Sequence, residues 1–255
     1  MSAVIFHRSR KCGAAVAAHG GDRPRLNAGS PFAIKEAYNS IRTKLMFTGK
    51  GEKCPVFAVT SPLAADGKTT VAVSLAVSVA MAEQKVLLID ADMRKPTVHR
   101  YFGTECSGGL SEILAGLTSE IKLRQTDCER LSILTAGQIP PNPAELLGSK
   151  QMDVLLEHVR KYFDYVIIDT PPINIVTDAT VIASKITGYV VVVRSSKNHL
   201  RDVSDAVRQI REMNGSIVGT VLNDPENRAE RSTRYRKYYS RSSYRYYGGN
   251  TELRK

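Results

Sequence analysis

The sequence predicts an α/β fold in which helices cover both faces of a mostly parallel sheet. Apolar segments recur along the chain, helical patterns separate several of them, and the first segment runs into a loop containing Gly-Lys-Thr. The apolar segments are mostly continuous rather than alternating, as expected of strands that are covered on both faces. They lie at 56–59, 86–89, 131–134, 165–168, 189–193 and 217–222.

Helical spacing of apolar residues accounts for most of the sequence between these segments. Ile34, Tyr38, Ile41 and Leu45 fall on one face of a helix at spacings of three and four. Asn142-Pro143 is a favourable helix start, with Asn as the cap and Pro in the first turn. Further helices are expected at 69–82, 143–163, 177–185 and 200–213. The alternation of strands and helices implies parallel pairing through right-handed crossovers.

The charge divides the chain into three parts. The 255 residues carry a formal net charge of +11, and 42% of them are apolar, enough for a substantial core. Residues 1–31 have a net charge of +4 and residues 226–255 of +6, so the middle is nearly neutral. We therefore expect a flexible basic arm at 1–31, a globular domain at 32–225 and a disordered Arg/Tyr-rich tail at 226–255. This distribution argues against a fold built to bind nucleic acid, so no nucleic-acid partner is expected.

The sequence predicts a cytoplasmic protein. No apolar run approaches the roughly 20 residues that span a bilayer. The four cysteines lie far apart with no CxxC pair, which favours neither a zinc site nor a disulfide framework.

The loop after the first strand has the character of a P-loop. Such a loop aims backbone N–H groups at phosphates, and the following helix adds partial positive charge. Lys68 would neutralise the β- and γ-phosphates of ATP, and the Thr69 hydroxyl would ligate Mg²⁺. Pro62 replaces the first Gly of the usual motif, so the loop alone would also fit an ordinary turn before a helix. The residues expected to contact the nucleotide are Ser61, Ala65, Asp66, Gly67, Lys68, Thr69 and Thr70.

Carboxylates follow two later strands. Asp90 and Asp92 end the second strand, and Asp169 ends a later one. Ligands of parallel sheets bind beyond the carboxyl ends of the strands, so these groups should meet Lys68 and Thr69. Carboxylate, hydroxyl and phosphate oxygens are the ligands that Mg²⁺ prefers. The sequence therefore predicts a P-loop NTPase-like ATP·Mg²⁺ site.

These motifs resemble those of the bacterial tyrosine kinases (BY-kinases), in the form found as a separate cytoplasmic protein. The similarity covers about residues 32–247. It comprises the loop at 60–70 as Walker A, Leu-Ile-Asp-Ala-Asp-Met-Arg-Lys-Pro at 88–96 as Walker A′ and Ile-Ile-Asp-Thr-Pro-Pro at 167–172 as Walker B. The paired-Asp motif with its trailing Arg-Lys-Pro is the most specific element.

The resemblance implies roles for individual residues. Lys68 would contact phosphate, while Thr69, Asp92 and Asp169 would place Mg²⁺. Asp90 is the first candidate to accept the tyrosine proton, with Arg94 beside it, although Asp90 and Asp92 could exchange roles. Ala65 stands where the family usually has Gly, which matters if the loop needs a positive φ.

The resemblance also implies partners. Glu36 and Arg42 match the family's self-assembly pattern, but Asn39 stands where that pattern has Arg. The expected partners are further copies in a ring, a transmembrane activator of the polysaccharide-chain-length type, a cognate phosphotyrosine phosphatase and protein substrates. The activator would recruit the kinase to the inner face of the membrane, where it would regulate capsular or exopolysaccharide synthesis.

Six of the eleven tyrosines cluster in the tail, without a helical or strand period. On a flexible tether they would reach a neighbouring active site at high effective concentration, as phosphoacceptors modified mainly between subunits. A basic-aromatic tail could instead bind nucleic acid or an anionic membrane. The predicted acceptors are Tyr235, Tyr238, Tyr239, Tyr244, Tyr246 and Tyr247.

The alternative function is a partitioning or division-site ATPase whose basic tail binds DNA or membrane. Proteins of that class usually carry an extra Lys near the start of the P-loop. Ser61, Pro62 and Leu63 occupy that region, which favours the kinase. A degraded family member that acts only as a scaffold is a third possibility.

Overall fold

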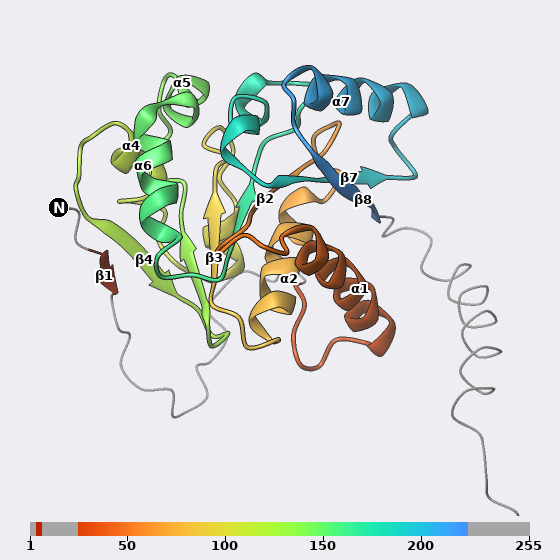
Figure 1. Cartoon of the computed structure of the whole chain (residues 1–255), viewed down its shortest axis with the longest axis horizontal. Helices are drawn as coiled ribbons and strands as arrows, with labels where there is room; N and C mark the ends of the chain where they lie inside the picture. The colour runs from red at the N-terminus through yellow and green to blue at the C-terminus, as the bar shows by residue number, and fades with distance from the viewer. Residues whose placement is uncertain (1–3, 7–24, 224–255) are drawn as a thin grey trace, which may run out of the picture.

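The computed structural model describes residues 4–6 and 25–223, which form a sheet between two layers of helices (Figure 1). Over these residues the sheet has eight strands in the order β1-β4-β5-β3-β6-β2-β7-β8. All neighbouring strands are parallel except β4 and β5, which confirms the predicted mostly parallel α/β fold. The strands are β1 (Val4–Phe6), β2 (Val56–Thr60), β3 (Val86–Asp90), β4 (Ile121–Gln125), β5 (Leu131–Leu134), β6 (Tyr165–Asp169), β7 (Gly188–Arg194) and β8 (Ile217–Asn223).

Helices cover the sheet on both faces and create two hydrophobic cores. Alternate residues of one strand serve opposite cores: Val86 and Leu88 face the core with α1 and α2, whereas Leu87 and Ile89 face the other. The helices are α1 (Phe32–Thr48), α2 (Lys68–Ala80), α3 (Val98–Tyr101), α4 (Leu110–Leu114), α5 (Pro143–Gly148), α6 (Lys150–Val159) and α7 (Leu200–Glu212), with 3₁₀ turns η1 (Thr177–Ala179) and η2 (Ala183–Lys185).

Helix α2 carries the P-loop lysine into the interior. It lies between the sheet and α1, and every residue of it except Thr70 is buried. A helix covered on all sides must be apolar all round, which matches its run of Val and Ala. It begins at Lys68 because Gly67 adopts a left-handed φ of 92° that turns the loop into the helix.

Two predicted helices differ from the structure. The segment 143–163 forms α5 and α6, divided at Ser149, whose extended backbone ends one helix and begins the next. The segment 177–185 forms two 3₁₀ turns instead of one α-helix. The Tyr189 hydroxyl donates to the Ala179 carbonyl at 2.6 Å, which takes that acceptor away from a helical ladder.

The packed part of the chain begins earlier than the predicted boundary at residue 32. Leu26 is buried, and its N–H donates to Ser74 Oγ at 3.1 Å. Arg25 pairs with Asp127 and lies over the Phe102 ring. Strand β1 pairs with β4, so residues 4–6 belong to the sheet. Residues 7–24, and the predicted tail at 226–255, lie outside the described residues.

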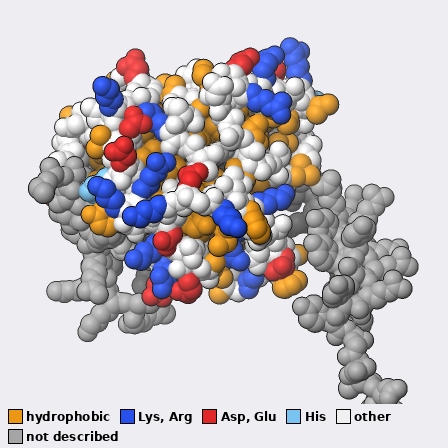
Figure 2. Space-filling model, viewed as in Figure 1, with side chains coloured by type: hydrophobic (Ala, Val, Ile, Leu, Met, Phe, Trp, Pro, Cys, Tyr) orange, Lys and Arg blue, Asp and Glu red, His pale blue; other side chains and the backbone are white. Residues whose placement is uncertain are grey.

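Charged side chains of both signs are interspersed on the face shown in Figure 2. This agrees with the nearly neutral middle of the sequence. Within residues 25–223, no helix combines the length and apolarity needed to cross a bilayer.

Candidate active site

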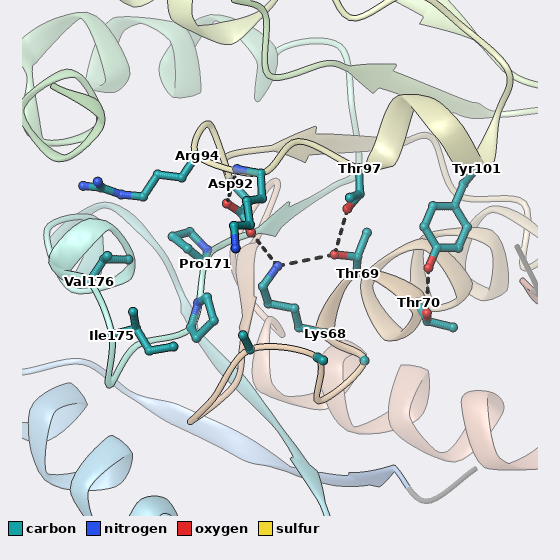
Figure 3. A pocket seen from close by; sticks show the side chains of 15 residues that line it. Lys68, Thr69, Thr70, Asp92, Arg94, Thr97, Tyr101, Pro171, Ile175 and Val176 are labelled. Atoms are coloured by element: carbon teal, nitrogen blue, oxygen red, sulfur yellow. Dashed lines mark hydrogen bonds and ion pairs between the residues drawn. The ribbon is translucent and has the colours of Figure 1, made fainter. Parts of the chain in front are cut away.

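The carboxyl ends of β2, β3 and β6 meet at one edge of the sheet. Asp90 and Asp169 are register partners at the ends of β3 and β6, and the P-loop leaves β2 between β6 and β7. A pocket of about 330 Å³ opens at this edge (Figure 3). It is lined by Ala64, Ala65, Gly67, Lys68, Thr69, Thr70, Asp92, Arg94, Lys95, Thr97, Tyr101, Pro171, Pro172, Ile175 and Val176.

Lys68 and Thr69 contact Asp92 and Asp169, as the sequence predicted. Lys68 Nζ donates to Asp92 Oδ2 at 2.7 Å and lies 4.0 Å from Asp169 Oδ1. Thr69 Oγ1 donates to Asp169 Oδ2 at 2.7 Å. Burial alone would lower the pKa of Lys68, but the charges of Asp169 and Asp92 outweigh it and raise that pKa. These four residues form one connected cluster.

The cluster fits a hard divalent cation. Asp169 Oδ1 is buried and accepts no hydrogen bond, which is costly for a carboxylate oxygen unless a cation or a donor satisfies it. Thr69, Asp92 and Asp169 offer the oxygen ligands that Mg²⁺ prefers. No cluster of three His, Cys, Asp or Glu side chains within the described residues forms a metal site by itself. Mg²⁺ would therefore need the Thr69 hydroxyl and phosphate oxygens as well.

Asp90 and Asp92 have different surroundings. Asp90 is fully buried, and its carboxylate accepts backbone N–H bonds from Asp92 at 3.2 Å and from Thr97 and Val98 at 3.0 Å. Burial, reinforced by the charge of Asp169, raises the pKa of Asp90 to about 8. Asp92 lines the pocket, whereas Asp90 does not. Asp90 thus shapes the loop that presents Asp92.

The P-loop is shaped from within by Asp66. Ala65 adopts a left-handed φ of 61°, the conformation that Gly would take without strain. Asp66 is buried and accepts hydrogen bonds from Leu63 N at 2.9 Å and Asn198 Nδ2 at 3.0 Å. The Ser61 hydroxyl donates to the Leu63 carbonyl at 2.8 Å. Of the predicted nucleotide contacts, Ser61 and Asp66 therefore support the loop and do not line the pocket.

A second set of residues, which the sequence reasoning missed, holds the P-loop from outside. Arg194 Nη1 donates to the Ala65 carbonyl at 3.3 Å, and Lys197 donates to the Ala64 carbonyl. Asn223 Nδ2 donates to the Asp66 carbonyl at 2.9 Å. The predicted parallel sheet could have indicated these residues, because β7 and β8 end at the same edge of the sheet as β2.

Arg94 is engaged across the pocket. Its Nε and Nη2 donate to the two carboxylate oxygens of Asp178, each at 2.9 Å. Asp178 is fully buried in η1. The hydrogen bonds to Asp178 raise the pKa of Arg94. Arg94 therefore ties the Walker A′ loop to the segment that follows Walker B.

The predicted oligomerisation residues lie on α1, outside the pocket, and contact groups of their own chain. Glu36 Oε1 accepts from Asn39 Nδ2 at 2.9 Å. Arg42 Nη1 donates to the Ser78 carbonyl of α2 at 2.9 Å. The six predicted acceptor tyrosines lie outside the described residues.

Comparisons with known proteins agree with this geometry. The AAA domain family matches residues 63–220. The chain is 37% identical to the tyrosine-protein kinase YwqD of Bacillus subtilis over 84% of this chain and 86% of that protein. It is 38% identical to the tyrosine-protein kinase CpsD of Streptococcus pneumoniae serotype 4 over 74% of this chain and 83% of that protein.

Solved structures give the same result. The kinase domain of the Escherichia coli tyrosine kinase ETK is 34% identical, with a TM-score of 0.71 over 75% of this chain and 76% of that chain. The septum site-determining protein MinD of Pyrococcus horikoshii is 20% identical, with a TM-score of 0.59 over 69% of this chain and 72% of that chain, and this likeness shows the fold alone. By sequence and by structure, this chain belongs to the bacterial protein-tyrosine kinases.

Proposed function

We propose that the chain transfers the γ-phosphoryl group of ATP to tyrosines in the tail of another copy. The observation that carries this proposal is the cluster of Lys68, Thr69, Asp92 and Asp169, brought together at the sheet edge where the pocket opens in a chain of the protein-tyrosine kinase family. Phosphoryl transfer requires positioning and charge neutralisation more than covalent chemistry by the enzyme. The Lys68 ammonium can neutralise phosphate charge, and the Thr69 hydroxyl and the Asp92 and Asp169 carboxylates can position a metal ion and the acceptor.

Lys68 has two partners in the reaction cycle. Without nucleotide its ammonium neutralises Asp92 and the nearby Asp169. Bound phosphates would compete for the ammonium, and Asp92 would then face the pocket without its cation. With Asp92 left free to accept a proton, Thr69 and Asp169 would hold Mg²⁺, which, when bound, neutralises charge on the phosphate oxygens.

The acceptor step needs a group that takes the tyrosine proton. The phenol oxygen forms a bond to the γ-phosphorus, the bond from that phosphorus to the β–γ bridging oxygen breaks, and ADP leaves with the bridging oxygen. The phenolic proton passes to a carboxylate. We assign this role to Asp92, because it lines the pocket while backbone N–H groups hold Asp90 behind it.

The proposed acceptors are the six tail tyrosines. Each phosphate adds about −1.5 to −2 charge at neutral pH, so complete modification would take the tail from +6 to about −3 to −6. Such a reversal would weaken contacts with acidic partners. The finer assignments remain parts of this proposal: a ring of copies, a membrane activator that brings the kinase to the inner leaflet, a phosphatase, and control of capsular or exopolysaccharide synthesis. The solved chimerical protein CapA2B2, 37% identical to this chain, supports the proposal that an activator partner exists.

Phosphosite mapping tests this function. After co-expression with the activator and incubation with ATP and Mg²⁺, mass spectrometry should find phosphate on the tyrosines between Tyr235 and Tyr247. Lys68→Met should lower the signal by about 100-fold or more, since one lost transition-state donor costs roughly 10²–10³.

The matched control is Lys122→Met, which removes a half-exposed lysine outside the pocket. It should retain the native signal. Full phosphorylation in Lys68→Met would contradict the role of Lys68. Tight, salt-sensitive DNA binding by residues 226–255 without tyrosine phosphorylation would instead support the partitioning-type function.

A further inference from the structure

The pocket has two chemically different ends on either side of Lys68 (Figure 3). At one end the Thr70 and Tyr101 hydroxyls are hydrogen-bonded at 2.7 Å, beside the P-loop. At the other end Pro171, Pro172, Ile175 and Val176 form an apolar wall. The wall begins two residues after Asp169 and lines the same pocket as Lys68, Thr69 and Asp92, where the metal ligands and Lys68 converge. The terminal phosphate of ATP is expected at that point.

The apolar wall is fixed in place by its backbone and by α7. Ile173 is buried, and its N–H donates to the Ser61 carbonyl at 2.9 Å. Asn174 Nδ2 donates to the Asp202 carbonyl of α7 at 2.8 Å, and Asn174 Oδ1 accepts from Gln209 at 3.0 Å. Ile175 nevertheless lines the pocket and is 57% exposed. The fold thus holds an aliphatic surface rigidly at the mouth of the site.

One ion pair sets the spacing between this wall and Asp92. Arg94 lies two residues after Asp92, and Asp178 lies two residues after Val176. Their bidentate pair therefore links the two sides of the pocket mouth. A planar guanidinium that donates two parallel bonds fixes orientation as well as distance.

We propose that the apolar wall of Ile175 and Val176 is the subsite for the aromatic ring of the acceptor tyrosine, with Arg94 as its positioning residue. This inference rests on the proposed function and identifies where that function binds its acceptor. A tyrosine ring packs on aliphatic side chains while its hydroxyl remains polar, which suits a wall that lines the same pocket as Asp92. A serine or threonine has no ring to cover the wall. The subsite therefore contributes to the selection of tyrosine.

The test measures acceptor binding and nucleotide binding separately. Both chains are assayed together with the activator used for phosphosite mapping. The enzyme is the full chain with its six tail tyrosines changed to Phe, and the acceptor is the full chain carrying Lys68→Met. Ile175→Ala in the enzyme should raise the KM for the acceptor chain roughly five- to tenfold, from lost ring contact. Ile175→Asp should raise it further. The affinity for a fluorescent ADP analogue should stay within about twofold of native.

The matched control is Val154→Ala, which shortens an exposed branched aliphatic residue on α6, outside the pocket. It should change neither quantity. An unchanged acceptor KM in both Ile175 variants would overturn the subsite while leaving the kinase function standing. A loss of ADP-analogue affinity at constant KM would overturn it too, because the wall would then hold the nucleotide. If the enzyme chain with native Ile175 bound nucleotide but transferred no phosphate to the acceptor chain, the proposed function and the subsite would be overturned together.

Discussion

The pocket lies between two walls, the P-loop and the apolar wall, and these are held in different ways. The P-loop is held largely through its own backbone: Arg194, Lys197 and Asn223 donate to its carbonyls, and Asp66 accepts one of its N–H groups. The apolar wall of Ile175 and Val176 depends on loop hydrogen bonds and on one side-chain ion pair, Arg94 with Asp178.

This difference shows how the loop tolerates an unusual sequence. Arg194, Lys197 and Asn223 donate to backbone carbonyls of the loop, and these contacts do not depend on the side chain at position 65. Ala65 can therefore occupy a left-handed position usually given to Gly. The spacing between the apolar wall and Asp92 is less tolerant, because it depends also on the shapes of the Arg94 and Asp178 side chains. Changes at the P-loop should therefore affect stability and nucleotide binding, and changes at Arg94 should affect the acceptor.

The largest expected effect on stability is that of Lys68→Met. It leaves Asp92 and Asp169 without their buried cation, and breaking such a pair typically costs about 3–5 kcal/mol. Mg²⁺ should recover part of this loss in the nucleotide-free variant and have little effect on the native chain. Urea unfolding with and without Mg²⁺ measures both. A variant as stable as native without Mg²⁺ would show that Lys68 does not neutralise these carboxylates.

Asp66→Ala should weaken the P-loop from within. It leaves Leu63 N and the Asn198 amide without their acceptor, at a cost of about 1–3 kcal/mol. Nucleotide affinity should fall with it, as measured by calorimetric titration. Asp205→Ala, which removes a partly exposed carboxylate on α7, is the control and should bind nucleotide normally. Native affinity in Asp66→Ala would mean that the external contacts hold the loop alone.

Arg94→Lys should weaken the placement of the apolar wall, because it keeps the positive charge and loses the bidentate contact with Asp178. We expect the KM for the acceptor chain to rise about fivefold, the equivalent of about 1 kcal/mol. Steady-state kinetics with the Lys68→Met chain as acceptor measure this change. Wild-type kinetics would show that a simple charge contact is enough to place the apolar wall.

Ala65→Gly should have the smallest effect. It relieves the left-handed strain at Ala65, about 1–2 kcal/mol, but adds chain entropy to the unfolded state, so a net gain of about 0.5–1 kcal/mol is expected. Ala64→Gly, at a position without positive φ, should instead destabilise the chain. Thermal unfolding of the two variants measures whether each substitution raises or lowers the melting temperature.

The sequence predicted the parts that local patterns encode. Continuous apolar runs located six strands, and strand ends brought Lys68, Thr69 and Asp169 to one edge. Strand β4 was missed, because its residues alternate between buried and partly exposed and include Lys122 and Arg124. The contacts of Arg194 and Asn223 with the P-loop were missed for a different reason. They join residues more than 125 positions apart, and no local period records such contacts.

The separate duties of the two walls can be tested by measuring nucleotide affinity and acceptor KM side by side in Asp66→Ala and Arg94→Lys. Asp66→Ala should lose nucleotide affinity. Arg94→Lys should raise the acceptor KM about fivefold while its nucleotide affinity stays native. If Arg94→Lys lost nucleotide affinity as strongly as Asp66→Ala, the two walls would form one binding surface and the division proposed for them would be wrong.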